Sequence, residues 1–409
     1  MDTPITIAGS TDYRDSLREI SQFDDDLRGF RRDLHAHPEL GFREERTARL
    51  IAETLRQSGF DEVHTQIGRT GVVGVLQGAA GRKSVALRAD MDALPIQETT
   101  DVAHRSVHTG LMHGCGHDGH VAMLLGAARY LACKRNFRGK VTFVFQPGEE
   151  GYAGAREMIE DGLFERFPID EIYALHNWPS LPVGTVAINA GPMMAARDDF
   201  WIRIHGVGGH GAIPHKTIDP IVVCAAVVNA LQSIVSRNVD PGASAVLTLH
   251  SVSAGTVIEP GLPTQSVTVP SAADLAGIAK WFDEATGKLI RRRIEEVARN
   301  CAAAFGAHAE VTYLPFLPPT VNHAVCSQLV VNTACDLLGT ERVLAGIPPG
   351  MASEDFSFML QAKPGAYFWL GVGEAAHSLH SSNYDFNDTV LATGAALLAS
   401  IAQRALEME

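Results

Sequence analysis

Apolar residues recur at three- and four-residue intervals in the first part of the chain, and this spacing predicts helices. Leu27, Phe30 and Leu34 follow it, Pro38 interrupts it, and a second apolar run over 48–55 restores it. Short runs of β-branched and aromatic residues come next and predict strands instead. This part of the chain is therefore expected to contain both helices and strands.

The expected strands alternate with helical segments along the chain. Strands are predicted over 72–76, 84–87, 141–145 and 171–175, and a helix over 121–131 separates the second strand from the third. Alternation of this kind favours an α/β fold, in which helices cover a mixed, mostly parallel sheet.

After Gly191 the pattern changes, which predicts a second, smaller domain inserted into the first. Residues 199–205 alternate like a half-exposed strand, 219–235 form a capped helix, 245–249 form a strand, and 275–304 are largely helical. These elements suit a small α+β, ferredoxin-like domain with its helices on one face of a sheet. The expected domains are a first part at 1–190, the insert at 191–312, and a second part of the first domain at 313–409.

Composition narrows the class of protein. The 409 residues exceed one ordinary domain, and 46% of them are hydrophobic while 20% are charged, as in a globular protein with a sizeable core. The formal net charge of -13 argues against a nucleic-acid partner, because phosphates require a basic surface.

Location can also be predicted from the sequence. Residues 1–21 lack a signal-peptide core, and polar side chains interrupt the most apolar stretch, 220–235. The six cysteines are scattered without the spacing of a disulfide framework. We therefore expect reduced thiols, a cytoplasmic location and no membrane partner.

The candidate chemistry centres on residues 112–120, with the sequence MHGCGHDGH. Cys115 and His117 are separated by one glycine, so a tight loop can turn both side chains toward one ion, and this pair suits zinc, manganese, cobalt or nickel. A buried thiol beside a hydrogen-bonded histidine explains this motif equally well when it is taken alone. The adjacent carboxylates Glu149 and Glu150, which directly follow an expected strand, favour the metal site.

Further polar residues follow other expected strands. Asp90 and Asp92 end one strand, where α/β sheets keep their active sites. Both could simply cap a loop, but beside a metal loop we expect Asp92 to orient a ligand. His176 ends the strand at 171–175; alone it would more often be structural, but it continues a series of polar groups at strand ends. His380 is the last candidate ligand.

Two other functions are excluded by the residue pattern. The glycine-rich stretch 206–211 is not a nucleotide-binding fingerprint, because the strand-turn-helix context is missing and Pro214 intrudes. A structural zinc site is also unsuitable, because such sites favour closed, cysteine-rich tetrahedra, whereas this set is rich in carboxylates and histidines.

Several of these motifs together resemble the M20 metallopeptidase family, in particular its amidohydrolase branch of hippurate hydrolases, N-acyl-amino-acid deacylases and indole-acetyl-amino-acid hydrolases. The similarity runs from residue 31 to the C-terminus in family order. The matching segments are 31–41 (RRDLHAHPELG), 88–95 (RADMDALP), 112–120, 145–150 (FQPGEE), 206–215 (GVGGHGAIPH), 354–357 (EDFS) and 379–380 (LH).

The resemblance implies a site with two divalent metal ions per subunit, of uncertain identity. It also implies a catalytic domain interrupted by a small lid that forms a homodimer, with a higher homo-oligomer as an alternative. Glu149 would be the general base, and His210 would reach the partner subunit's active site to stabilise the oxyanion. The metal ligands would be Cys115, His117, Glu150, His176 and His380.

One stretch, from Thr256 to Ala273, departs from the family pattern. Relatives carry an Asn and later an Arg that help to hold the substrate carboxylate, whereas here Glu259 and Thr268 stand at those places. Pro263 and Pro270 bracket what is expected to be a weakened strand. Either another cation binds the carboxylate, or the altered stretch weakens substrate binding or changes the substrate class. In the second case Glu259→Asn and Thr268→Arg, singly and together, should rescue hippurate turnover.

The predicted function is metal-dependent hydrolysis of the amide bond of N-acyl amino acids, with hippurate-like or indole-acetyl-like substrates. One alternative is a dipeptidase or carbamoyl-amide hydrolase of the same superfamily, which would differ in the substrate pocket. Another is a non-catalytic binding protein on the same scaffold. Retention of Glu149 together with the full ligand set argues against the binding protein.

Overall fold

The computed structural model describes residues 14–256, 267–374 and 376–408. The chain forms two compact units. The first comprises Met1–Met193, Val321–Pro348 and Asp355–Glu409, and the second comprises Met194–Thr320 and Pro349–Glu354. The sequence-based boundary at residue 312 falls inside a strand, β13 (His308–Leu317).

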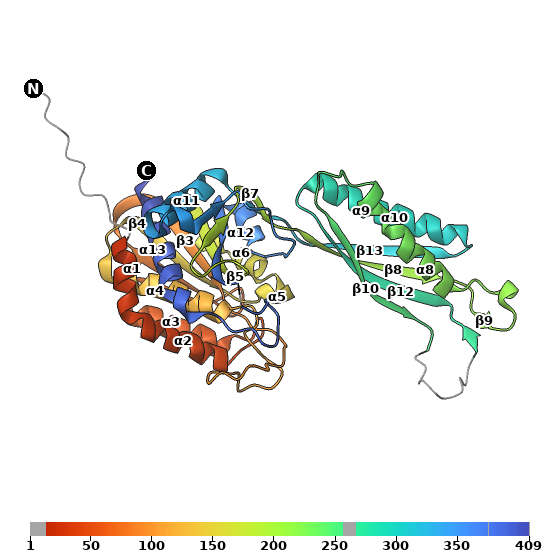
Figure 1. Cartoon of the computed structure of the whole chain (residues 1–409), viewed down its shortest axis with the longest axis horizontal. Helices are drawn as coiled ribbons and strands as arrows, with labels where there is room; N and C mark the ends of the chain where they lie inside the picture. Colours follow the sequence, from red (N-terminus) through yellow and green to blue (C-terminus); the bar gives the residue numbers. More distant parts are fainter. Residues whose placement is uncertain (1–13, 257–266, 375, 409) are drawn as a thin grey trace, which may run out of the picture. The chain divides into compact units, whose positions relative to one another are not determined.

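The first unit, whose strands β3, β4 and β5 are labelled in Figure 1, is built on an eight-stranded sheet. The strand order is β1-β2-β4-β3-β5-β16-β6-β15. The four central strands β4, β3, β5 and β16 run parallel, while β1, β2 and β4 pair antiparallel and so do β16 and β6. The expected mixed, mostly parallel sheet is thereby confirmed. The strands are β1 (Glu62–Ile67), β2 (Gly71–Gln77), β3 (Ala79–Asp90), β4 (Arg138–Gln146), β5 (Glu171–Pro179), β6 (Val186–Ile188), β15 (Val343–Ala345) and β16 (Gly365–Gly373).

Helices α4 (His117–Lys134) and α13 (Leu391–Glu407) pack against each other and against the sheet. Most residues of both helices are buried because the helices lie between the sheet and an outer layer of helices, although Arg129 and the C-terminal end of α4 are exposed. The remaining helices of this unit are α1 (Arg14–Ile20), α2 (Asp24–Ala36), α3 (Glu45–Gln57), α5 (Glu149–Tyr152), α6 (Gly154–Glu160), α7 (Leu163–Arg166), α11 (Ala324–Leu338) and α12 (Ser357–Ala362).

The second unit follows the order β8-α8-β10-β12-α10-β13, and its four strands form an antiparallel sheet in the order β10-β12-β8-β13. This is the β-α-β-β-α-β arrangement of ferredoxin-like domains, as expected. Its elements are β8 (Arg197–His205), β9 (Gly209–His210), α8 (Pro220–Leu231), α9 (Ser233–Arg237), β10 (Val246–Ala254), β11 (Thr268–Val269), β12 (Ala272–Lys280), α10 (Glu284–Ala304) and β13. The short strands β7 (Gly191–Met194) and β14 (Thr320–Asn322) lie at its two ends in the chain.

The prediction that 275–304 is largely helical was wrong at its start. Strand β12 runs to Lys280, and α10 begins only at Glu284, where the Asp283 carboxylate accepts a hydrogen bond from the Thr286 N–H. Every second residue of β12 is buried against the helices, from Ala273 to Ala279. The sequence does not indicate a strand here because the buried positions are alanine, leucine and glycine, most of which are poor strand formers.

The weakened lid strand expected between Pro263 and Pro270 falls partly on residues that the structure does not describe. Its described part contains Thr268 in β11, a two-residue strand that pairs with β9, and the four-stranded sheet of the second unit uses the nine residues of β12. Glu259 and Pro263 lie outside the described residues.

Within the described residues, two helical stretches are apolar and long enough, by length and composition alone, to cross a membrane: 220–237 and 388–407. In the second stretch 83% of the residues are buried inside the first unit, so this helix serves as a core helix. The first stretch covers the sheet of the second unit, with 33% of its residues buried.

Candidate metal centre

The candidate site lies where three neighbouring parallel strands end. Strand β3 ends at Asp90, β4 leads into Glu149 and Glu150, and β5 carries His176 near its end. Because β4, β3 and β5 are adjacent and parallel, their carboxyl ends meet at one edge of the sheet. The sheet topology therefore brings together side chains that are up to 86 positions apart in the sequence.

The loop before α4 depends on Gly116, which has a φ of 88°. That conformation favours glycine, and a Cβ atom there would stand 2.4 Å from the Asn177 Oδ1 atom. The turn starts α4 at His117 and leaves Cys115 just before it. Both side chains are buried, and the Cys115 Sγ atom lies 3.5 Å from the His176 Nε2 atom.

Hydrogen bonds fix how the two histidines face the site. The His117 Nδ1 atom lies 3.0 Å from the Asp92 carbonyl oxygen and 3.2 Å from its Oδ1 atom, and the His176 Nδ1 atom lies 2.7 Å from the Asn177 carbonyl oxygen. Since those partners only accept, each Nδ1 carries a proton, and each ring in its neutral form has its lone pair on Nε2. Burial lowers the pKa of His176, so its ring stays neutral.

The surroundings of His117 attract positive charge. Burial alone would lower the pKa of this ring, but the charge of Asp90 and the hydrogen bond with Asp92 outweigh it and raise the pKa to about 10. Among the described residues the buried Nε2 atom has no hydrogen-bond partner, although Asp90 Oδ2 lies 3.7 Å away. A buried nitrogen without a partner, in a site that favours a cation, is the environment expected of a metal ligand.

Glu149 and Glu150 follow a sharp turn at Gly148, which has a φ of 58°. The Glu150 N–H donates to Asp92 Oδ2 at 2.9 Å, so the two oxygens of Asp92 contact both His117 and the glutamate turn. Glu150 Oε1 lies 3.1 Å from His380 Nε2. Burial alone would raise the pKa of Glu150, but the hydrogen bond and charge of His380 help to lower it, so this carboxylate is ionised.

His380 reaches the site from the loop between β16 and α13. Its backbone has a φ of 65°, and its N–H donates to the Gly114 carbonyl oxygen at 2.8 Å, which ties the loop to the Cys115 turn. The side chain is 51% exposed, so it forms the open side of an otherwise buried cluster.

The structure brings all five predicted ligands into overlapping groups, with Glu149 beside them. In each group the candidate donor atoms lie within 4.8 Å of one another. Three such groups lie in the first unit: Cys115 with Glu150 and His380; His117 with Glu149 and Glu150; and Asp90 with His117, His120 and His176. The mixture of thiolate, imidazole and carboxylate donors suits zinc, manganese, cobalt or nickel better than calcium or magnesium.

Asp90 and His120 belong to this cluster but were not predicted as ligands. Asp90 is fully buried; its Oδ1 atom lies 2.5 Å from His120 Nδ1, and its Oδ2 atom accepts from Arg88 at 2.8 Å. Burial alone would raise the pKa of Asp90, but the charges of His117, Arg88 and His120 hold it well below its usual value. The signals were present in the sequence: His120 ends the MHGCGHDGH motif, and Asp90 ends a buried strand.

A second buried network behind the metal loop was also missed. Asp118, the residue after His117, accepts from His35 Nδ1 at 2.9 Å, and Arg31 Nη1 lies 3.4 Å from the same Oδ2 oxygen. The other ring nitrogen of His35 lies 3.4 Å from Glu98 Oε1. Burial alone would lower the pKa of His35, but the hydrogen bond with Asp118 and the Asp118 charge raise it to about 9. The buried His35 ring is therefore charged at neutral pH.

His210 lies on β9 in the second unit, and its side chain is exposed. The Ala212 N–H donates to His210 Nδ1 at 3.1 Å, so in the neutral ring Nε2 carries the proton. The backbone around His210 is held by β11, in which Thr268 pairs with His210. The strand beside His210 therefore lies within the stretch that departs from the family pattern.

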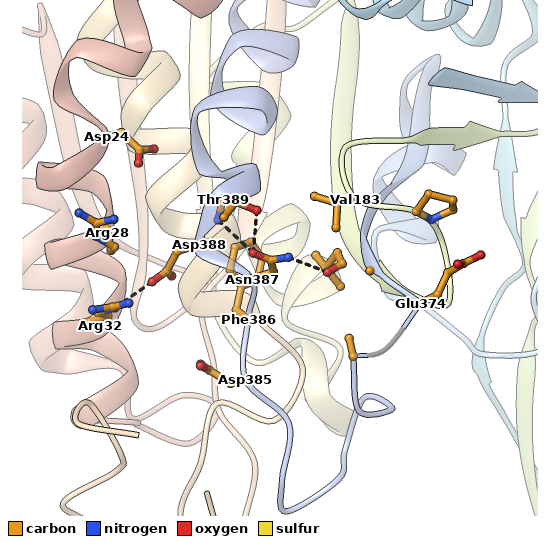
Figure 2. A pocket seen from close by; sticks show the side chains of 14 residues that line it. Asp24, Arg28, Arg32, Val183, Glu374, Asp385, Phe386, Asn387, Asp388 and Thr389 are labelled. Atoms are coloured by element: carbon orange, nitrogen blue, oxygen red, sulfur yellow. Dashed lines mark hydrogen bonds and ion pairs between the residues drawn. The ribbon is translucent and has the colours of Figure 1, made fainter. Parts of the chain in front are cut away.

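A separate hollow of about 870 Å³ lies in the first unit beside α2 (Figure 2). Its lining includes Asp24 and Arg32, and Arg32 Nε donates to Asp388 Oδ2 at 2.8 Å. The Asn387 side chain donates to the Val372 carbonyl oxygen at 2.9 Å. None of the predicted metal ligands lines this hollow, so it is not the candidate metal centre.

Comparison with known proteins agrees with this geometry. Residues 86–404 match the model of peptidase family M20/M25/M40. The chain is 40% identical to a hippurate hydrolase of Campylobacter jejuni over 391 residues, which cover 96% of this chain and 99% of that protein. It is 38% identical to the IAA-amino acid hydrolase ILR1-like 4 of Arabidopsis thaliana over 400 residues, 96% of this chain and 88% of that protein.

A solved structure gives the same result. It is the YXEP protein of Bacillus subtilis, described as a dinuclear metal binding peptidase from the M20 family. The TM-score is 0.81 at 31% identity, and the match covers 95% of this chain and 99% of that chain.

Proposed function

The chain belongs to peptidase family M20/M25/M40, and we propose that it is a metal-dependent amidohydrolase that cleaves N-acyl amino acids into a carboxylic acid and a free amino acid. The observation that carries the proposal is the buried cluster at the ends of β3, β4 and β5. It combines five potential metal ligands with one further carboxylate, Glu149.

The donor set fits two divalent ions. The His117 and His176 rings both hold Nδ1 in a hydrogen bond, which leaves Nε2 for an ion, and one thiol and one ionised carboxylate stand beside them. Among the described residues His117 Nε2 has no hydrogen-bond partner, and a bound ion would take the place of the proton on that nitrogen. When bound, the ions would polarise the amide carbonyl and lower the pKa of a water molecule. We assign the ion contacts to Cys115, His117, Glu150, His176 and His380.

Glu149 is the proposed general base. It shares a group with His117 and Glu150, so it stands beside the ion-binding atoms. In the proposed reaction it accepts a proton from the attacking water and then returns that proton to the departing amine nitrogen. Asp92 is the proposed orienting residue, because it holds His117 Nδ1 with one oxygen and the Glu150 N–H with the other.

His210 is the proposed oxyanion donor. Its neutral ring carries a proton on Nε2, so it can donate to the tetrahedral oxyanion without first being protonated. We further propose that it acts across a homodimer formed through the second unit, and that the protein works in the cytoplasm.

The test is hydrolysis of a panel of N-benzoyl-, indole-acetyl- and N-acetyl-amino acids, with dipeptides and carbamoyl-amino acids included. The protein is reconstituted with zinc, manganese, cobalt or nickel, and bound metal is counted per chain. We expect turnover to require metal and to fall at least about 100-fold in Glu149→Gln, because general-base catalysis contributes about 10²- to 10⁴-fold. Metal content should stay unchanged in this variant.

Three outcomes would count against the proposal. A chain that binds no divalent metal would refute the metal centre. Metal binding without turnover of any substrate would favour a binding protein on this scaffold. Turnover confined to dipeptides or carbamoyl-amino acids would assign the chain to one of those substrate classes instead.

A further inference from the structure

One histidine ring and two tryptophan rings share one face of the sheet at the candidate metal centre. His176 and Trp178 are two positions apart on β5, so both side chains point to the same face. Trp369 on the neighbouring parallel strand β16 is registered with His176, which places its indole on that face as well. The rings of His176 and Trp178 have their centroids 6.3 Å apart.

The two indoles form a rigid pair. Their centroids are 3.9 Å apart and their planes differ by 8°, so one ring lies flat on the other. Trp369 is 5% exposed and belongs to the core of the unit, whereas Trp178 is only half-buried. Trp178 therefore presents an accessible aromatic surface whose orientation is fixed from behind, close to a predicted metal ligand.

We propose that Trp178 is a specificity-determining residue that stacks on an aromatic acyl group of the substrate. The proposal rests on the function proposed above and extends it to a substrate class: N-aroyl and N-arylacetyl amino acids in preference to N-acetyl ones. A substrate whose amide carbonyl lies at the cluster has its acyl group one or two bonds away, within reach of a ring beside His176.

The aromatic character of the indole pair suits the acyl side rather than the amino-acid side of the substrate. The amino-acid part carries a carboxylate, which would need a cation or several N–H donors. Across the described ranges, no lysine or arginine makes a cation–π contact with Trp178 or Trp369. The face of a half-buried indole that is stacked on a second indole suits an uncharged aryl group instead.

The experiment compares kcat and KM for N-benzoylglycine, an indole-acetyl-amino acid and N-acetylglycine in metal-reconstituted wild type, Trp178→Leu and Trp178→Phe. We expect Trp178→Leu to lower the ratio of kcat/KM for benzoyl over acetyl substrate about tenfold, mainly through KM, because leucine keeps apolar volume but removes the ring. Trp178→Phe should retain most of the preference.

A matched control is Phe23→Leu. This ring lies in the same unit, in the 3-10 turn between α1 and α2, with the Arg129 guanidinium 4.3 Å from its centroid, so its recorded contact is with a residue outside the candidate metal centre. We expect this variant to leave the benzoyl-to-acetyl ratio unchanged. A binding measurement completes the set: N-benzoylglycine should bind Glu149→Gln more tightly than the double variant that also carries Trp178→Leu.

The outcomes separate this inference from the proposed function. If wild type cleaves the panel but Trp178→Leu and Trp178→Phe keep the wild-type ratio and binding, the role of Trp178 is refuted while the amidohydrolase remains. If wild type binds metal but cleaves none of these substrates, both proposals fail. If Trp178→Leu does not fold, Trp178→Phe decides. Because phenylalanine keeps an aromatic ring, loss of the benzoyl-over-acetyl preference in kcat/KM in this variant would overturn the proposal.

Discussion

The buried pair of His35 and Asp118 should make the stability of the first unit depend on pH. The perturbation is His35→Gln, which keeps a polar side chain of similar length but removes the charge. In wild type the ring contacts Asp118 and Glu98, the Arg31 charge opposes its protonation, and the His104 ring lies with its centroid 5.3 Å away.

The magnitude follows from linkage. The pKa of His35 rises from 6.5 to about 9 in the folded state. At about 1.36 kcal/mol per pH unit this corresponds to roughly 3 kcal/mol of free energy of unfolding. Because the folded-state pKa is the higher one, that contribution is fully present below about pH 6.5 and is lost as the pH rises through about 9.

The assay is equilibrium unfolding in urea at a series of pH values, with Trp201→Phe and Trp281→Phe as the background for both proteins. Those two tryptophans belong to the second unit, so the fluorescence of Trp178 and Trp369 then reports the first unit. We expect His35→Gln to lower the free energy of unfolding of the first unit by roughly 3 kcal/mol more at about pH 6 than at about pH 10.

A difference in stability that is the same at both pH values would refute this reasoning. It would mean that the ring is neutral in the folded protein and that the ion pair with Asp118 does not form. Asp118→Asn is the matched variant: it should lower the pKa of His35 and abolish the same pH dependence. Persistence of the full pH dependence in Asp118→Asn would place its origin elsewhere.

Three further predictions concern the metal loop and its supports. Asp92→Ala should weaken metal affinity about 10- to 100-fold, measured by competition with a chelator, because His117 loses the group that orients its ring; unchanged affinity would remove Asp92 from the site. Gly119→Ala should destabilise the protein by about 1–3 kcal/mol in urea unfolding, since its Cβ would stand 2.3 Å from the Phe386 ring, and an equally stable variant would contradict this packing. Burial raises the pKa of Glu44 to about 7, so in metal-free protein its ionisation removes stability as the pH rises from about 4.5 through about 7; Glu44→Gln should flatten that loss, and an identical pH profile would disprove it.

Much of the fold was predictable because most of its central strands contain runs of apolar, β-branched and aromatic residues. The apolar run at 141–145 lies inside β4, and the run at 171–175 lies inside β5. Such β-branched and aromatic runs report burial on both faces of a parallel sheet. Strand β12 could not be recognised in this way, because its buried positions are small residues whose role is set by the helices packed on them.

The candidate site was predictable only where one segment contains several of its residues. Cys115 and His117 share one loop and Glu149 and Glu150 share one turn, so spacing alone suggested their chemistry. His35 and Asp118 are 83 positions apart, and their pairing exists only after α2 packs against α4. A histidine inside an amphipathic helix carries no sign in the sequence that a buried carboxylate will meet it.

The discontinuity of the first unit has a consequence for how the protein is made. Strand β16 completes the sheet between β5 and β6, and α13 fills the core, yet both come from the last fifth of the chain. The sheet of the second unit lies wholly within 197–317, so it can fold on the ribosome while the first unit still lacks its centre. Until β16 is available to pair with it, the edge of β5 has unpaired backbone groups that other strands can bind, which favours aggregation.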